Sequence, residues 1–347
     1  KKQTGKRLAG KKLKTMQIPV KLIGNVASPY TRKMIAYLRY KRIPYEVIWG
    51  QPEEVLKNMN IEAPKPVLLP VFLFEREGQL KAECDSTPII REFEEKYSAR
   101  SVLPNDPALN FINYVLEDFG DEWCTKYMFH YRWYFQEDAD NAGTILPLGI
   151  NSNLNDEELK FFKDVFAKRQ IDRLWVVGSN DDTAEFIDKS YRNVLKIFEN
   201  HFKLSPFLLG NTPSSCDFAI YGQFTQLVGF DPTPRRIAHE ISPRTIAWVN
   251  TLDDRGGLDF QENNNRLEDI SESIHELFKE LSVSYVPTMI ENSNAHRQGN
   301  DQWEVALKDN TWKQKTFPYQ AKCLKWIKEE FDKLDDDEKI YYPYNKH

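Results

Sequence analysis

Four short stretches in the first hundred residues decide the fold: 20–24 (Val-Lys-Leu-Ile-Gly), 28–32 (Ser-Pro-Tyr-Thr-Arg), 69–74 (Leu-Pro-Val-Phe-Leu-Phe) and 85–90 (Asp-Ser-Thr-Pro-Ile-Ile). The first and third are short and apolar, which predicts strands. The other two hold a serine and a proline near their start, which is typical of a helix cap followed by a first helical turn. A strand and a helix therefore alternate twice along this segment.

The residues between these stretches complete a β-α-β unit followed by a β-β-α unit. Residues 44–49 (Pro-Tyr-Glu-Val-Ile-Trp) predict the second strand. Residues 71–74 and 80–82 predict a hairpin with Glu77 and Gly78 in its turn. A helix over 89–97 is expected to close the unit.

This order resembles the thioredoxin-like N-terminal domain of the glutathione S-transferases, and three local matches carry the resemblance. Residues 28–34 are similar to the turn in which the family places its thiol-activating residue. Residues 69–71 are similar to the turn with the family's cis-proline. Residues 85–89 are similar to its pair of an acid and a serine before the third helix. The resemblance implies an α/β thioredoxin-like domain followed by a larger all-α domain.

The resemblance implies that glutathione is the co-substrate and that a hydroxyl group favours its thiolate, which is the nucleophile. Ser28 and Tyr30 are the candidates. Ser28 has the better position because a helix N-terminus also stabilises an anion. The alternative for Ser28 is a plain helix cap.

Five further residues are implied as contacts of glutathione. Asp85 would receive the γ-glutamyl ammonium, and Ser86 with its backbone N–H would hold the carboxylate. Helix capping is the alternative for this pair. Leu69 would pair its backbone with glutathione ahead of a cis Pro70. Arg32 is a candidate partner for a glutathione carboxylate.

The middle of the chain is expected to be helical. Residues 110–135, 156–176 and 183–202 predict helices, and residues 139–155 predict a loop. One face of the first helix carries aromatic or imidazole side chains, and the resemblance would make them line a pocket for an apolar acceptor. An ordinary core face is the alternative. These residues are Trp123, Tyr127, His130 and Tyr131.

A second resemblance lies at Ser214 and Asp217, which form a capping box just before an apolar run. It is similar to the buried helix cap of the family's all-α domain, so Asp217 is expected to be structural. We expect domains at 20–98 and 108–255, after a basic and disordered arm at 1–19. Residues 256–347 form an extension, with helices over 267–282, 286–295 and 319–334, that is expected to pack on the all-α domain.

Composition limits the function classes. The 347 residues carry a formal net charge of −5, so the chain as a whole offers no surface for nucleic acid. No apolar run has membrane-spanning length. The four cysteines are scattered and show no zinc-ligand spacing, which indicates reduced thiols and no metal. A cytoplasmic location is expected, with a mitochondrial one as the alternative because the N-terminal arm is basic.

Two functions fit these observations. The first is a glutathione-dependent transferase or lyase that activates the glutathione thiol for attack on an apolar electrophile. The second is a catalytically inactive protein of the same fold that acts as an assembly subunit or binding module, since a fold does not fix a function. A homodimer or incorporation in a larger complex is open in both cases.

Overall fold

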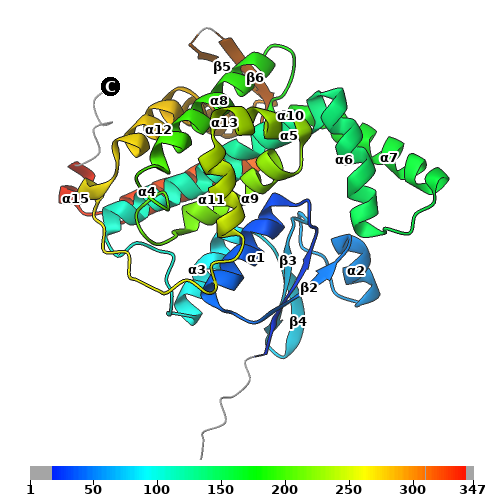
Figure 1. The fold of residues 1–347 in the computed structure, drawn as a ribbon, viewed down its shortest axis with the longest axis horizontal. Helices are drawn as coiled ribbons and strands as arrows, with labels where there is room; N and C mark the ends of the chain where they lie inside the picture. Colours follow the sequence, from blue (N-terminus) through cyan, green and yellow to red (C-terminus); the bar gives the residue numbers. More distant parts are fainter. Residues whose placement is uncertain (1–17, 309, 341–347) are drawn as a thin grey trace, which may run out of the picture.

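The computed structural model describes residues 18–308 and 310–340. The expectation of a disordered basic arm falls, apart from residues 18 and 19, outside the described residues. The chain forms a small α/β domain followed by a larger body of helices (Figure 1). This is the thioredoxin-like architecture with a mainly helical remainder that the sequence predicts.

One four-stranded sheet organises the N-terminal domain, with the strand order β2-β1-β3-β4. β1 runs parallel to β2 and antiparallel to β3, and β3 runs antiparallel to β4. Glu77 and Gly78 form the predicted hairpin turn, with φ of 54° and 75°. The strands are β1 (Val20–Gly24), β2 (Tyr45–Trp49), β3 (Val71–Arg76) and β4 (Gln79–Glu83).

Three helices accompany the sheet: α1 (Pro29–Lys41), α2 (Pro52–Asn58) and α3 (Ser86–Lys96). The predicted start of α1 is confirmed, because the Ser28 hydroxyl accepts a hydrogen bond from the Thr31 N–H and Pro29 is the first helical residue. Buried Met34, Ile35 and Leu38 fix α1 to the core. Local turn chemistry therefore places α1 directly after the end of β1.

The long helix predicted over 110–135 contains a change of pitch. It consists of α4 (Pro107–Asp118), a π-helical turn at Phe119–Trp123, and α5 (Cys124–Tyr134). A Cβ atom on Gly120 would lie 2.8 Å from the backbone nitrogen of Ile220, so glycine permits the close approach of a neighbouring helix here. Single π turns inside α-helices occur often at functional sites.

The prediction of a loop over 139–155 is wrong for most of its length, since residues 136–150 form the helix α6 (Gln136–Ile150). This helix contains Pro147. Ala139, Ala142 and Leu146 are buried together with Trp133 of α5. This apolar packing outweighs the low helix propensity of the glycine and proline in the segment. The segment that follows, α7 (Asp156–Ile171), has no buried residue, and Figure 1 shows α6 and α7 projecting together from the helical body.

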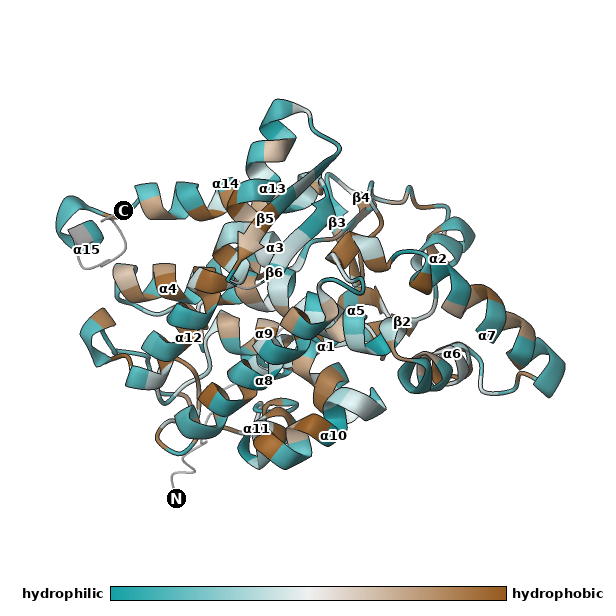
Figure 2. Ribbon diagram, turned by 90° about the horizontal axis from the view of Figure 1, so that it is seen from above, coloured by the Kyte–Doolittle hydropathy of each residue, from teal (hydrophilic) through white to brown (hydrophobic). Residues whose placement is uncertain are grey.

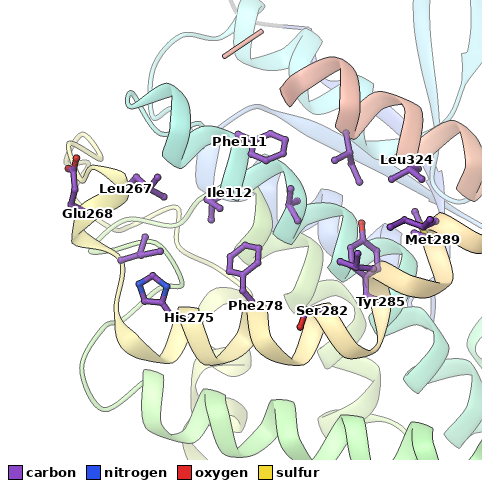
Figure 3. A pocket seen from close by; sticks show the side chains of 15 residues that line it. Phe111, Ile112, Leu267, Glu268, His275, Phe278, Ser282, Tyr285, Met289 and Leu324 are labelled. Carbon is purple, nitrogen blue, oxygen red and sulfur yellow. The ribbon is translucent and has the colours of Figure 1, made fainter. Parts of the chain in front are cut away.

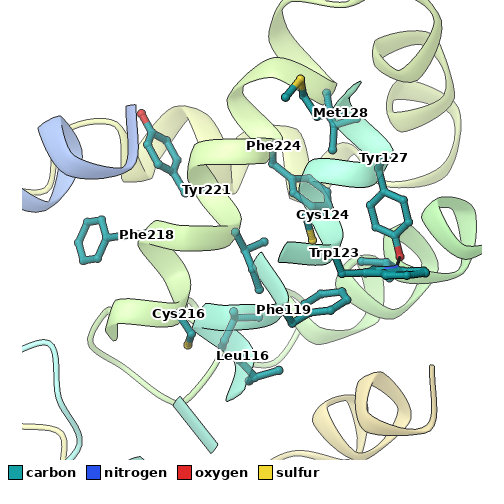
Figure 4. Packing of buried hydrophobic residues seen from close by; sticks show 14 of the residues in the cluster. Leu116, Phe119, Trp123, Cys124, Tyr127, Met128, Cys216, Phe218, Tyr221 and Phe224 are labelled. Atoms are coloured by element: carbon teal, nitrogen blue, oxygen red, sulfur yellow. Dashed lines mark hydrogen bonds between the residues drawn. The ribbon is translucent and has the colours of Figure 1, made fainter. Parts of the chain in front are cut away.

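Helix α9 (Ser215–Gly229) lies at the centre of the helical body, and the capping box of Ser214 and Asp217 at its start is confirmed. Asp217 also accepts the N–H of Leu208 at 2.9 Å, which supports a structural role. Gly222 faces α1, and a Cβ atom there would lie 2.4 Å from the Pro29 carbonyl oxygen. Figure 4 shows the buried side chains of α9 with those of the π turn and α5. The remaining helices of this body are η2 (Leu174–Val177, 3-10), α8 (Ala184–His201), α10 (Pro232–Ile241) and α11 (Pro243–Leu252).

The C-terminal extension packs on the helical body. Its Trp312 is buried, with its ring centroid 5.3 Å from that of Trp123. Helix α14 runs antiparallel to α4, because Gln320 contacts the Glu122 carbonyl and the Phe331 ring lies 5.4 Å from the Phe111 ring. The elements are η3 (Leu267–Asp269, 3-10), α12 (Glu272–Val283), α13 (Tyr285–Gln298), β5 (Gln302–Leu307), β6 (Asn310–Lys315), α14 (Pro318–Asp332) and α15 (Asp336–Ile340).

Apolar residues are distributed unevenly over the elements, as Figure 2 shows. In the described part of the chain no helix is both long enough and apolar enough to cross a membrane. None of the four cysteines is in a disulfide.

Candidate functional site

The register of the sheet brings the three family-like motifs to one edge. Ile23 pairs with Val71, and Phe72 pairs with Glu83. The end of β1, the start of β3 and the end of β4 therefore lie side by side. As a result the turn at Ser28, the Leu69–Pro70 peptide and the Asp85–Ser86 pair share this edge. The Leu69–Pro70 peptide bond is cis, as the resemblance implies.

Asp85 starts α3 in an unusual backbone conformation, with φ 93° and ψ 105°. Residues in such sparsely populated regions occur preferentially at functional sites. Its side chain makes no cap hydrogen bond to α3. Instead, Oδ2 accepts the hydroxyl of Tyr319 at 3.0 Å and lies 3.7 Å from Nζ of Lys322. The first turn of α3 therefore keeps N–H groups that Asp85 does not cap, and such groups bind anions.

Ser86 is joined to a buried ion network that links the two parts of the chain. The ammonium of Lys33, which is completely buried, lies 2.9 Å from Ser86 Oγ, 3.1 Å from Glu117 Oε1 and 2.7 Å from Asp121 Oδ2. An ammonium has three donors, and these three acceptors satisfy it. Because Ser86 Oγ accepts from Lys33, its O–H can donate only to a different group, as binding a carboxylate requires.

The network perturbs its carboxyl groups. Burial alone would raise the pKa of Glu117, but Arg91 and Lys33 hold that pKa well below its usual range. Burial raises the pKa of Asp121, and Lys33 only partly opposes this effect. Burial also raises the pKa of Glu122 to about 8, with repulsion from Asp118 adding to the shift. The π turn therefore carries acids that hold their protons more tightly than exposed carboxyl groups do.

The two candidate hydroxyls have different surroundings. Ser28 Oγ accepts the Thr31 N–H at 3.2 Å and keeps its own O–H for another partner. Tyr30 is partly buried, and its hydroxyl donates to the Asp121 carbonyl oxygen at 2.7 Å. Burial also raises the pKa of Tyr30 well above its usual value. The Tyr30 proton is thus already used, whereas the Ser28 O–H donates to none of the residues that the structure describes.

Arg32 lies in a different contact from the one the resemblance implies. Its guanidinium lies 2.6 Å from Asp253 Oδ1, and Arg39 lies 2.8 Å from the other oxygen of the same carboxylate. Tyr221 donates to Asp253 as well. These contacts tie α1 to the end of α11.

The four residues predicted to line an acceptor pocket are fully buried and bonded to each other or to neighbours. The Trp123 indole N–H donates to the Tyr127 hydroxyl at 2.7 Å. His130 Nδ1 lies 2.7 Å from Ser179 Oγ, and the Tyr131 hydroxyl donates to Asp188. Burial lowers the pKa of His130 to about 4. These are the contacts of a filled core, and a role in acceptor binding stays a prediction.

An apolar cavity of about 490 Å³ lies elsewhere, between α4 and the extension (Figure 3). Ile112 and Val115 line it from α4, facing Phe278, Tyr285 and Leu324 of the extension. Glu117 lies roughly 140–160° around α4 from Ile112 and Val115, given 3.6 residues per turn. Helix α4 therefore separates this cavity from the ion network.

Several residues of this region were not predicted from the sequence. Lys33 falls next to the apolar stripe of its helix, where a buried charge is rare. The signal that could have indicated a network is the group of four acids at 117–122 inside an otherwise apolar helix. Tyr319 and Lys322 carried no signal, because their contact with Asp85 joins residues 234 positions apart. Within the described residues, no three His, Cys, Asp or Glu side chains gather as a metal site requires.

Comparison with known families agrees with the geometry of the sheet edge. Residues 22–101 match the family model described as glutathione S-transferase, N-terminal domain. The chain carries a glutathione S-transferase N-terminal domain. Its cis-proline turn and its Asp85–Ser86 pair both fall inside the matched residues. No curated protein matches the chain.

Solved structures similar to this transferase-like chain have low sequence identity to it. One is a glutathione transferase family member from Pseudomonas fluorescens with two glutathione bound, at 14% identity, 69% of this chain, 92% of that chain and a TM-score of 0.44. Another is FzlA from C. crescentus, with 18% sequence identity and a TM-score of 0.41; the match covers 69% of this chain and 89% of that chain. A third is the Tau class glutathione S-transferase MiGSTU from mango, with 18% sequence identity and a TM-score of 0.39; the match covers 76% of this chain and 98% of that chain. The family assignment rests on residues 22–101.

Proposed function

We propose that this chain is a glutathione-dependent transferase or lyase that activates the glutathione thiol for attack on an apolar electrophile. One observation carries the proposal. The sheet register and the buried link from Lys33 to Ser86 hold the turn at Ser28, the cis Leu69–Pro70 peptide and the Asp85–Ser86 pair at one edge.

Each group at this edge suits one part of glutathione. The Asp85 carboxylate takes the γ-glutamyl ammonium, and the Ser86 hydroxyl with the first N–H groups of α3 takes the adjacent carboxylate. The backbone of Leu69 pairs with the cysteinyl residue. The Ser28 O–H donates to the sulfur and favours the thiolate, whose proton passes to solvent. The thiolate then forms the new sulfur–carbon bond with the electrophile, while the electron pair of the bond broken at that carbon departs with a leaving group or moves to the adjacent atom, which takes a proton from solvent.

Calorimetry with glutathione tests the binding site. Asp85→Ala and Ser86→Ala should each weaken binding by about 1–3 kcal/mol, because each removes a charge-assisted hydrogen bond. Glu62→Ala is the matched control, since Glu62 is an exposed acid of the same domain. Unchanged affinity in both site variants would remove this site.

A second function, an assembly subunit, is favoured by the surface of α7. Phe161, Phe162 and Val165 are 63%, 46% and 54% exposed. Apolar side chains grouped in this way mark interaction surfaces. A wild-type chain that shows no affinity for glutathione, but forms a complex or dimer in light scattering, would favour this function over the transferase.

For either function we propose a cytoplasmic location, since four free thiols suit a reducing compartment.

A further inference from the structure

The C-terminal extension reaches the edge of the sheet where the glutathione motifs lie. Tyr319 and Lys322, in the first two turns of α14, both contact Asp85 Oδ2. We propose that Lys322 is a further glutathione-binding residue, which joins Ser86 in binding the γ-glutamyl carboxylate while Asp85 takes the neighbouring ammonium. This inference rests on the proposed function and adds to the site a residue from far outside the matched residues 22–101.

Lys322 can accept a ligand without leaving its position. Its Nζ lies 3.7 Å from Asp85 Oδ2, which is beyond hydrogen-bonding distance, so the two charges attract each other while the ammonium keeps its donors. The side chain of Lys322 is 48% exposed, so a ligand can reach it. The rings of Tyr319 and Trp326, at 5.0 Å and 4.2 Å from Nζ, hold the ammonium by cation–π contact.

The charges around Asp85 explain why a cation is needed there. Asp121 and Glu122 lie nearby. Burial raises the pKa of Tyr319, and the charges of these two acids raise it further. Asp85 and ionised Asp121 disfavour a ligand carboxylate, whereas Glu122, with a pKa of about 8, stays largely neutral at pH 7. Lys33 is committed to Glu117 and Asp121 and cannot offset that repulsion for the ligand. Lys322 supplies the missing positive charge on the exposed side.

The pair of Asp85 and Lys322 matches the amino-acid end of glutathione, which carries an ammonium and a carboxylate on one carbon atom. A site with an anion and a cation side by side recognises both charges and rejects ligands that carry only one of them. The Asp85 side chain is only 13% exposed, but it keeps one oxygen for the ammonium, because its Oδ1 accepts no hydrogen bond from the residues that the structure describes.

Two shortened ligands separate the two charges of glutathione. 4-Aminobutanoyl-Cys-Gly lacks the γ-glutamyl carboxylate, and glutaryl-Cys-Gly lacks the ammonium. Lys322→Ala should weaken the binding of glutathione and of glutaryl-Cys-Gly about tenfold and leave 4-aminobutanoyl-Cys-Gly unchanged, because a charge-assisted hydrogen bond is lost only with the first two. Asp85→Asn should weaken the binding of glutathione and of 4-aminobutanoyl-Cys-Gly and should not weaken the binding of glutaryl-Cys-Gly, whose carboxylate Asp85 repels.

Lys325→Ala is the control, since Lys325 lies on the same helix, is 74% exposed and pairs with Glu329. It should bind all three ligands as the wild type does. If Lys322→Ala binds all three like the wild type, the inference is overturned and the proposed function stands. Tighter glutathione binding by Lys322→Ala also overturns it and makes α14 an inhibitory cover of Asp85. A wild-type chain that does not bind glutathione overturns both proposals.

Discussion

At the scale of single residues, Lys33 stands out because its charged ammonium is buried and needs hydrogen-bond partners from several elements. Its ammonium is completely buried and stabilised by Ser86, Glu117 and Asp121, which come from three separate elements. We expect Lys33→Met to lower the free energy of unfolding by about 3–5 kcal/mol, because it leaves buried Asp121 without its ion-pair partner, while Glu117 keeps Arg91. Urea unfolding measures the loss.

Lys21→Met serves as the control for Lys33→Met. Lys21 is 48% exposed and pairs with Glu46 on the surface, where ion pairs contribute about 0–1 kcal/mol. An equal, small loss in both variants would show that the network contributes little to stability.

Ser28 and Tyr30 give the second prediction at this scale. Ser28→Ala should reduce turnover strongly while leaving the affinity for glutathione nearly intact, because its O–H acts on the sulfur. Tyr30→Phe should keep turnover and lose about 1 kcal/mol of stability, since its hydroxyl is bonded to the Asp121 carbonyl oxygen. Steady-state kinetics and thermal unfolding report the two effects. If Tyr30→Phe loses turnover and Ser28→Ala does not, the activating hydroxyl is that of Tyr30.

At the scale of elements, the π turn predicts the dependence of stability on pH. Loss of solvent raises the pKa values of Asp121 and Glu122 in this turn and of the partly buried Asp118 just before it, and the pKa of Glu122 reaches about 8. An acid with a higher pKa in the folded state binds more protons there than in the unfolded state. The free energy of unfolding should therefore fall as the pH rises from about 4 to about 8.

Glu122→Gln tests this pH dependence. The variant should show a flatter decline of stability above pH 6 in urea unfolding at several pH values, because the amide does not ionise. Glu185→Gln, with a side chain that is 70% exposed, should keep the wild-type slope. A wild-type stability that rises between pH 5 and pH 8 would contradict this prediction.

The elements also show which parts of the fold the sequence predicts. The start of α1, the hairpin turn and the capping box of α9 follow from local chemistry, and each was predicted correctly. The π turn depends on Gly120 meeting the backbone of α9, which is a contact between distant residues. The helix α6 depends on burial against Trp133, which outweighs its glycine and proline. Long-range packing decides both features, and local patterns do not contain it.

At the scale of the whole molecule, the extension is part of the core. Leu277, Leu281 and Trp312 are almost completely buried. Removing residues 256–347 would expose the apolar faces that they cover, so we expect a truncated chain to aggregate. Gel filtration with light scattering measures this. A truncated chain that stays monomeric and equally heat-stable would show that the extension is a separable docking module.

A point substitution tests the same interface more gently. Trp312→Ala should cost about 3–5 kcal/mol of stability, because it leaves a cavity beside Trp123. Trp49→Ala is the control, since Trp49 is 50% exposed and its removal leaves no cavity. Equal and small losses in both would mean that the helical body closes over the space left by Trp312.

Some parts of the candidate site could be predicted from the sequence, and others could not. The three motifs near the sheet were found in the sequence because each is local, and the strand register then brings them together. The ion network and the contact from α14 could not be found in this way. The stripe of Leu324 and Ile327 predicts that α14 is amphipathic and covers an apolar surface, but it does not say which surface.

The contact of Tyr319 with Asp85 has a consequence for the order of events during synthesis. The two residues are separated by 234 positions, and a ribosome adding about 5–20 residues per second needs roughly 10–50 s to cover that distance. N-terminal domains generally fold first, so the sheet and its edge form while α14 is still inside the ribosome or not yet made. Each new chain thus passes through a period with a folded N-terminal domain and an uncovered Asp85. Chains that terminate before residue 319 cannot form the Tyr319 contact and keep Asp85 uncovered.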